Sequence, residues 1–312
     1  MPSYTAIFED TAPFLTYTGE WVAGRSLSDD FTQLYSQSSF MVTNRQDCAF
    51  SFEFYGSGFG IYGAKRGNHG LFQVTVDGTE FPPESGLPSG PDQFNATLFS
   101  LSLPRGFHTV QLRNSENTYR DIDYVSWEAN IGLDDEPLIV NTVQDSHPAW
   151  VYDPPDAWTD RPVLAGTFSG ATGHATTVDG ASASLSFQVR DAIAVYGPAG
   201  PNCTFSYTVS VDGQAINRTF SALKDFYRPQ QLLYYVGNLG PGNHVISFMQ
   251  VLQGIQAGRS GQQHTLAIDY AEIYTTPSLG GRFVSNSSVT AQILTSKPIA
   301  ISFSSVEGSG IR

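Results

Sequence analysis

The chain has 312 residues and a formal net charge of −13, with aromatic side chains at 13% and charged side chains at only 14%. So many aromatic side chains must be buried, which excludes intrinsic disorder, and the length allows about two domains of roughly 150 residues each. The acidic balance excludes the basic surface that nucleic acids require. No window approaches eighteen consecutive apolar residues, so we expect no membrane insertion.

The first part of the chain reads as short strands separated by turns. Residues 50–54 and 59–62 are predicted to pair as a hairpin, with its turn at Tyr55-Gly56-Ser57-Gly58. Residues 72–76 alternate apolar and polar side chains, as a strand with one buried face does, and Asp77-Gly78 then supplies a tight turn. No stretch has helical periodicity, so we expect an all-β fold.

The second part of the chain repeats the first at an offset of about 135 residues. FQVTVDG at 72–78 returns as YTVSVDG at 207–213, and IDYV at 122–125 returns as IDYA at 268–271. The offset grows to about 146 before the last block, which predicts an inserted loop at residues 252–263. We therefore predict two tandem antiparallel β-sandwich (jelly-roll) domains related by an internal repeat. Their predicted limits are 1–132 and 133–277, and residues 278–312 form a C-terminal extension or contain an extra strand at 299–303.

The recurring blocks are an acidic start with Tyr and Trp, F-x-F followed by G-I-Y-G, V-x-V-D-G, G-x-H and a closing I-D-Y. Over residues 4–275 this pattern resembles the tandem jelly-roll, galactose-binding-like modules of surface proteins of basidiomycete fungi. The resemblance implies the sandwich of carbohydrate-binding modules, with glycan binding at loops or on a concave face. Asp191 and Ala194 replace Gly58 and Gly60 in the second copy, which argues against one shared ligand.

Loops at one end of each sandwich are the predicted ligand site. Because consecutive strands reverse direction, residues 64–70 and 104–107 are expected at one end, and Ser57, residues 78–94 and residues 114–120 at the other. The second end holds the longer loops, and sugar recognition requires an aromatic face beside amide, carboxylate or guanidinium groups. The predicted ligand contacts are Asn114, Glu116, Asn117, Tyr119 and Arg120 in the first copy and Asp225, Tyr227 and Arg228 in the second.

The sequence carries no strong catalytic signature, such as Gly-x-Ser-x-Gly or His-Glu-x-x-His. His108 and His244 recur at equivalent positions, each directly after a glycine turn, and we predict structural histidines bonded to their own turns. Trp21, Trp150 and Trp158 lie in the opening segments, where packing over the core is expected.

Two aspartates, Asp123 and Asp269, stand inside otherwise apolar closing strands, where aspartate is disfavoured. One interpretation is that they accept hydrogen bonds from backbone, Tyr or Ser donors inside the sandwich. The other is a structural calcium site, in which Glu9 and Asp10, or Asp145, join the closing-strand aspartate as oxygen ligands if the first and last strands are neighbours. No other cofactor is expected.

Sequons beginning at Asn95, Asn202, Asn217 and Asn286 favour a secreted or cell-surface glycoprotein. The acidic start of the chain at Glu9 and Asp10 differs from the apolar stretch of a signal peptide. Cys48 and Cys203 are compatible with one disulfide or with two buried thiols.

Three functions remain open from the sequence. The first is non-catalytic binding of a glycan or cell-wall polysaccharide. The second is a glycan-processing hydrolase with two carboxylates about 5–10 Å apart in a cleft between the domains; its candidates are Glu128, Asp134, Asp135, Glu136 and Glu272. The third is a structural or adhesive surface protein.

Overall fold

The computed structural model describes residues 3–24, 29–133, 135–189, 192–240, 242–252, 264–281 and 289–294. Every regular element in these ranges is a β-strand or a short 3-10 helix, and every ladder between named strands is antiparallel. The predicted all-β, antiparallel sandwich class is therefore confirmed. The described part of the chain contains no helix with the length and apolarity needed to cross a bilayer.

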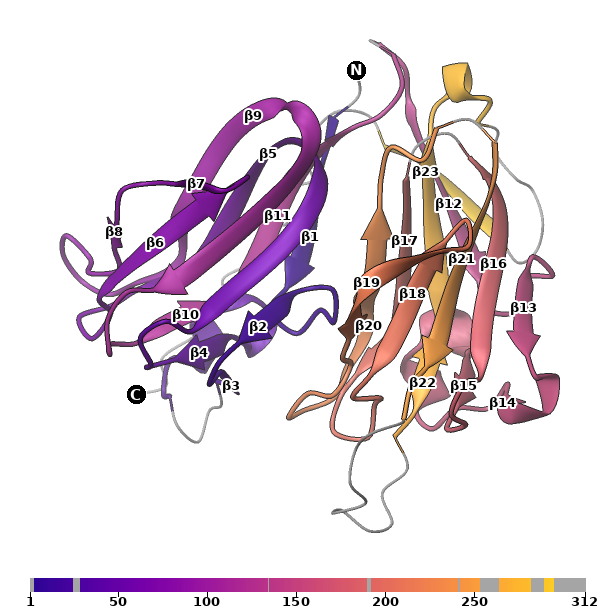
Figure 1. Cartoon of the computed structure of the whole chain (residues 1–312), viewed down its shortest axis with the longest axis horizontal. Helices are drawn as coiled ribbons and strands as arrows, with labels where there is room; N and C mark the ends of the chain where they lie inside the picture. The colour runs from indigo at the N-terminus through magenta and orange to yellow at the C-terminus, as the bar shows by residue number, and fades with distance from the viewer. Residues whose placement is uncertain are drawn as a thin grey trace, which may run out of the picture.

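The strands up to residue 130 form an eight-stranded sheet and a three-stranded sheet, together called the first sandwich here (Figure 1). The larger sheet contains β1 (Ser3–Glu9), β2 (Thr16–Thr18), β5 (Ala49–Lys65), β6 (Leu71–Val76), β7 (Thr79–Glu80), β8 (Glu84–Ser85), β9 (Gln93–Asn114) and β11 (Tyr124–Asn130). The smaller sheet contains β3 (Val22–Ala23), β4 (Met41–Thr43) and β10 (Arg120–Ile122).

The strands from residue 138 onward form two five-stranded sheets and one three-stranded sheet, called the second sandwich (Figure 1). One sheet has the order β20 (Arg228–Val236), β17 (Ala192–Ala199), β23 (Tyr270–Thr275), β12 (Leu138–Gln144) and β24 (Val289–Leu294). The next has the order β13 (Trp150–Asp153), β16 (Ser182–Val189), β21 (Gly242–Gln250), β18 (Tyr207–Val211) and β19 (Gln214–Phe220). The small sheet contains β14 (Trp158–Thr159), β15 (His174–Thr176) and β22 (Leu266–Ile268).

Among the described residues, no ladder joins a strand of the first sandwich to a strand of the second. This division agrees with two tandem domains, although the proposed limits stay a prediction. Strand β24 pairs with β12, so part of the predicted extension adds a strand to the second sandwich. The strand predicted at 299–303 and nearly all of the loop predicted at 252–263 lie outside the described residues.

The hairpin predicted at residues 50–62 is wrong, because β5 runs unbroken through it. Strand β5 pairs with β9 along its whole length, and the ladder passes the Gly56–Gly58 segment with a register shift. A Cβ atom on Gly56 would lie 2.2 Å from the carbonyl oxygen of Glu128. Glu128 belongs to β11, so this glycine permits close passage of the β5 backbone against β11, beside the arch that β5 forms with β9 (Figure 1), and it does not mark a chain reversal.

Contacts at positions predicted to be equivalent support the repeat hypothesis. The hydroxyl of Tyr17 donates to the carbonyl oxygen of Asp10 at 3.0 Å, and the hydroxyl of Tyr152 donates to that of Asp145 at 2.8 Å. The backbone amide of Asp10 likewise donates to Asp123, and that of Asp145 donates to Asp269. The two sandwiches thus join their first and last strands in the same way.

One contiguous apolar core extends through both sandwiches. At the junction Tyr4 stacks on Tyr274 with ring centroids 4.8 Å apart, and Phe14 stacks on Phe220 at 6.5 Å. The hydroxyl of Thr11 also donates to the side-chain oxygen of Gln231 at 2.6 Å. Phe8 of β1 also lies 6.4 Å from Tyr235 of β20, measured between ring centroids, so the two sandwiches meet through closely packed side chains.

Cys48 and Cys203 are both free and buried, which settles the choice in favour of two thiols. Cys48 adjoins β5 of the first sandwich, whereas Cys203 precedes β18 of the second. Burial raises the pKa of Cys203 to about 12, so this thiol is unreactive at neutral pH.

Candidate functional site

Two residues of the first predicted ligand cluster are buried and stabilise the fold. Asn114 is buried, and its amide donates to the carbonyl oxygen of Thr118 at 2.8 Å. Arg120 is buried as well, donates to the carbonyl oxygen of Gly70 at 2.8 Å, and lies 4.4 Å over the ring of Phe72. Both side chains face protein, so neither is placed to contact a ligand at the surface.

The other three residues of that cluster lie nearer solvent. Glu116 accepts the backbone amide of Leu71 at 2.9 Å, and Asn117 accepts that of Gln46 at 3.0 Å. Tyr119 is 44% exposed. Tyr119 is the one aromatic residue among the five predicted contacts, and its ring is accessible to a ligand.

The predicted grouping of loops in the first sandwich is wrong. A backbone bridge joins residues 64–70 to residues 114–120, so these two loops share one end. Residues 104–107 lie at the arch beside Ser57, where β9 pairs with β5. The error follows from the missed continuity of β5, because one false chain reversal moves each later turn to the wrong end.

The second predicted cluster lies at the junction of the two sandwiches. The Nη2 of Arg228 donates to the carbonyl oxygen of Gln37 at 2.6 Å, across the junction, and its guanidinium lies 4.8 Å over the ring of Phe226. The hydroxyl of Tyr227 lies 3.0 Å from that of Thr167. Arg228 therefore bridges the sandwiches, while Tyr227 packs within the second one.

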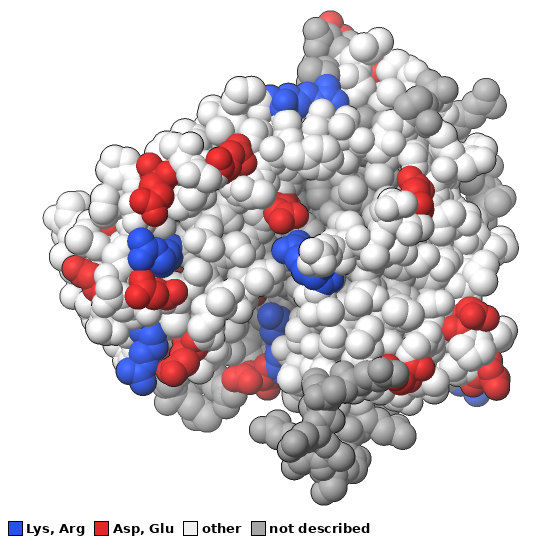
Figure 2. All heavy atoms as spheres, in the orientation of Figure 1, with Lys and Arg blue, Asp and Glu red and all other residues white. Residues whose placement is uncertain are grey.

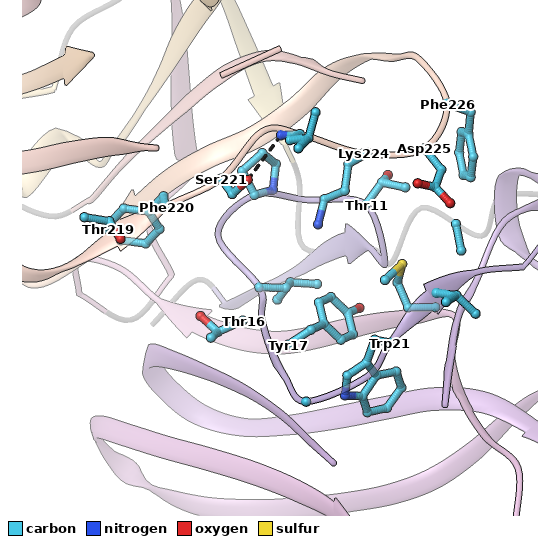
Figure 3. A pocket seen from close by; sticks show the side chains of 17 residues that line it. Thr11, Thr16, Tyr17, Trp21, Thr219, Phe220, Ser221, Lys224, Asp225 and Phe226 are labelled. Atoms are coloured by element: carbon cyan, nitrogen blue, oxygen red, sulfur yellow. Dashed lines mark hydrogen bonds between the residues drawn. The ribbon is translucent and has the colours of Figure 1, made fainter. Parts of the chain in front are cut away.

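Asp225, from the same cluster, lines a cleft of about 430 Å³ between the two sandwiches (Figure 3). One wall is formed by the opening segment of the first sandwich and β3–β4, and the other by residues 219–226. The described lining residues are Thr11, Pro13, Leu15, Thr16, Tyr17, Gly19, Trp21, Val22, Ala23 and Met41 on one side and Thr219, Phe220, Ser221, Leu223, Lys224, Asp225 and Phe226 on the other. We call this space the junction cleft.

Aromatic side chains line the junction cleft. Tyr17 and Trp21 form an edge-to-face pair with ring centroids 5.2 Å apart, and both are partly exposed. The indole Nε1 of Trp21 donates to the carbonyl oxygen of Thr18 at 3.2 Å. Trp21 packs against the core, as predicted, and also lines the cleft. Phe226 lies across from this pair on the second sandwich (Figure 3).

Lys224 brings a cation to the same cleft. Its ammonium lies 5.4 Å from the centre of the Tyr17 ring. The side chain keeps partial exposure through the cleft, yet protein atoms enclose the ammonium closely enough that burial lowers the pKa of Lys224. The nearby carboxyl of Asp10 counteracts this shift.

The carboxyl groups proposed as calcium ligands in the first sandwich accept hydrogen bonds from serines. Asp10 accepts the Ser39 hydroxyl at 2.7 Å, and Asp123 accepts the backbone amide of Ser36 at 3.0 Å. Burial raises the pKa of Asp10 to about 7 and that of Asp123 to about 8. Burial raises the pKa of Glu9 as well. Asp10 and Asp123 are therefore largely protonated at mildly acidic pH.

The second sandwich repeats the arrangement. Asp145 accepts the Thr172 hydroxyl at 2.6 Å and bonds His174 at 2.7 Å. Asp269 accepts the backbone amide of Ser169 at 2.9 Å, and burial raises the pKa of Asp269 to about 7. The interpretation of Asp123 and Asp269 as buried hydrogen-bond acceptors is confirmed.

Within the described ranges, no group of three or more His, Cys, Asp or Glu side chains is arranged to hold a metal ion. Calcium binding by these residues therefore stays a prediction. If calcium is structural, adding a chelator lowers the melting temperature by several degrees, because loss of a ligand bound only by the folded state removes its stabilisation. The measurement is a thermal melt of one preparation with calcium and with chelator. Coincident curves would end the calcium hypothesis.

The recurring histidines have the structural role predicted for them. His108 bonds Asp77 at 2.7 Å and the carbonyl oxygen of Pro104 at 2.8 Å. His244 bonds Asp212 at 2.8 Å and the carbonyl oxygen of Gly240 at 3.2 Å. His108 thus ties the arched part of β9 to the turn after β6, and His244 ties the residues before β21 to the turn after β18.

The acidic residues predicted for a hydrolase are separated from the cleft lining. Glu128 accepts the hydroxyl of Thr5 at 2.6 Å, Glu136 accepts that of Ser278 at 2.6 Å, and Glu272 accepts that of Tyr196 at 3.1 Å. Asp135 is exposed, and Asp134 lies outside the described residues. Asp225 is the one carboxylate among the described residues that line the junction cleft.

No family model matches the chain, and a search of curated proteins finds no match. Solved structures that are similar in part include a Paenibacillus xanthan lyase, with 16% identity and a TM-score of 0.32 over 86% of this chain and 26% of the lyase. A family two carbohydrate esterase from Cellvibrio japonicus has 19% identity and a TM-score of 0.30 over 41% of this chain and 34% of the esterase. The CBM36-1 domain of a multidomain xylanase from the hindgut metagenome of Trinervitermes trinervoides has 15% identity and a TM-score of 0.29 over 42% of this chain and all of that domain. The chain thus spans about a quarter of the lyase and a third of the esterase.

Proposed function

We propose that the protein binds carbohydrate without catalysis, and that the junction cleft is the binding site. The observation that carries this proposal is the lining of the cleft, where Tyr17, Trp21 and Phe226 lie among the hydroxyl groups of Thr16 and Ser221. The volume of about 430 Å³ is in the range of ligand sites.

This mixture of side chains matches the surface of a sugar ring. A pyranose presents a face of C–H groups, which packs on an aromatic ring, and a rim of hydroxyl groups, which need hydrogen-bond partners. Trp21 has its Nε1 already bonded to the backbone of its own segment, so its ring is held in place before a ligand arrives. A preorganised aromatic face costs little entropy on binding.

Binding is favoured over hydrolysis by the acidic residues of the cleft. Glycoside hydrolysis by the usual mechanisms needs a pair of carboxyl groups flanking the scissile bond. Asp225 stands without a second carboxylate among the described lining residues. We therefore do not propose a hydrolase.

A glycan or cell-wall polysaccharide as partner agrees with a secreted or cell-surface location. Asn95, Asn202 and Asn217, which begin three of the four sequons, are exposed, as glycosylation requires. Asn286 lies outside the described residues. The fungal origin implied by the sequence resemblance stays part of this proposal.

The replacement of Trp21 by alanine tests the site. In native gels containing xylan, β-1,3-glucan, galactomannan or polygalacturonate, we expect the wild-type protein to be retarded by at least one polysaccharide. Trp21→Ala should weaken that binding about tenfold or more, because the sugar loses its stacking surface.

Two further variants make this result specific. Phe107→Ala removes a 65% exposed aromatic side chain on the β5–β9 arch, away from the cleft, and should bind as the wild type does. Tyr119→Ala tests the loop cluster predicted from the sequence. Loss of binding in Tyr119→Ala with full binding in Trp21→Ala would contradict the cleft as the site, and no binding by the wild type would contradict the function.

A further inference from the structure

Lys224 is the one basic residue among the described residues that line the junction cleft. Lysine is scarce in this chain, which has three: Lys65, Lys224 and Lys297. A cation at the centre of the site in a protein of net charge −13 is therefore a distinctive feature.

The ammonium of Lys224 points into the cleft, toward Tyr17 (Figure 3). Its close contact is with the face of that ring, at 5.4 Å from the centre. Within the described part of the chain, its Nζ has no ion pair. The carboxyl that favours its charged form is that of Asp10, which is fully buried and bonded to Ser39.

An enclosed ammonium with so little compensation is costly, and burial accordingly lowers its pKa. A ligand carboxylate placed beside the ammonium would favour its charged form and would offset part of the free energy of burial through a charge-assisted hydrogen bond. The cleft thus has a point where an anionic group is preferred to a hydroxyl.

Two arginines also lie near the cleft. Arg218 donates to the hydroxyl of Thr16 at 3.3 Å, and Arg228 reaches Gln37 across the junction. Figure 2 shows basic atoms along the boundary between the two sandwiches, with acidic atoms beside them. Asp225 lies between Lys224 and Phe226 on the same wall of the cleft (Figure 3).

We propose that the junction cleft selects acidic sugars: the carboxylate of a uronic acid residue pairs with the Lys224 ammonium, while its ring packs on Tyr17 and Trp21. This inference rests on the proposed carbohydrate function and specifies its ligand class. The aromatic rings supply affinity for the ring face, and Lys224 supplies discrimination between a uronate and the corresponding neutral sugar.

Polygalacturonate and alginate, each compared with its carboxyl-reduced neutral form, are suitable probes. The wild-type protein should bind at least one of these uronates about tenfold more tightly than the reduced polymer, a difference of about 1.4 kcal/mol. Added salt should weaken the binding, because the ion pair is partly exposed.

Variants of Lys224 test whether this residue causes the preference for uronate over the reduced polymer. Lys224→Met should lose the discrimination between uronate and reduced polymer, whereas Lys224→Arg should keep part of it. Lys65→Met removes a lysine of β5 that does not line the cleft and serves as the matched control. Thermal melts of all variants show whether each is folded.

The outcomes separate this inference from the proposed function. Equal binding of uronate and reduced polymers, no binding of either uronate, or unchanged discrimination in Lys224→Met would each overturn the inference. If a neutral polysaccharide still binds and Trp21→Ala abolishes that binding, the proposed function stands alone. If the wild type binds no polysaccharide, both fail.

Discussion

Replacing Phe14 with alanine is expected to lower the free energy of unfolding by about 3–5 kcal/mol, as for other buried phenylalanines. Phe14 is 2% exposed and stands in the first sandwich, yet its ring contacts Phe220 and Tyr234 of the second as well as Trp127 of its own. The guanidinium of Arg218 also lies 5.4 Å from its centre. Removing the ring leaves a cavity at the point where the two cores join.

Urea unfolding followed by tryptophan fluorescence measures this loss. Phe107→Ala removes the same side chain from an exposed position, so it should change the free energy of unfolding by less than about 0.5 kcal/mol. A Phe14→Ala protein as stable as Phe107→Ala would show that the two sandwiches do not stabilise each other through this contact.

The protein is expected to lose stability as the pH rises from about 5 to about 8. Burial raises the pKa of Asp10 and of Asp269 to about 7 and that of Asp123 to about 8, whereas an aspartate in the unfolded chain titrates near 3.9. Between these values the folded protein holds protons that the unfolded chain releases. Raising the pH therefore favours unfolding, and the stability declines until the folded-state pKa values are passed. Each group contributes on the order of a few kcal/mol.

Melting temperatures measured in chelator across this pH range test the expectation. The wild type should melt several degrees lower at about pH 8 than at about pH 5. Asp123→Asn and Asp269→Asn should each flatten the profile, because the amide cannot ionise, while the exposed Asp156→Asn should leave it unchanged. A wild-type profile that rises over this range, or that is equally steep in all variants, would contradict the buried, protonated state of these carboxyls.

Local patterns in the sequence predicted the strands well. The alternation at residues 72–76 is matched by the burial of Phe72, Val74 and Val76, and the turn aspartate Asp77 is bonded to His108. The strand and its turn are each determined by residues adjacent in the sequence, so they can be predicted without knowledge of the rest of the fold. The turn predicted at Gly56-Ser57-Gly58 was wrong because glycine is common both in turns and at close contacts between backbones. Which of the two occurs depends on the neighbouring strands, which the local sequence does not show.

The candidate site was only partly predictable. Asp225 was expected at a ligand site and lines the junction cleft. Asn114 and Arg120 were expected there too, but their side chains are buried and hydrogen-bonded to backbone carbonyl groups. Trp21 and Lys224 are about two hundred residues apart in the sequence and line one cleft only because the two sandwiches dock. No local pattern reports such docking. A lone lysine in a loop has no signature until its neighbours are known.

The most direct measurement is a crystal structure of the protein soaked with an oligosaccharide cut from the polysaccharide that retards it most strongly. We predict a sugar ring in the junction cleft, with one face on Trp21 or Tyr17 and polar contacts to the segment 219–226 of the second sandwich. A sugar bound at residues 114–120, with the junction cleft empty, would contradict the account.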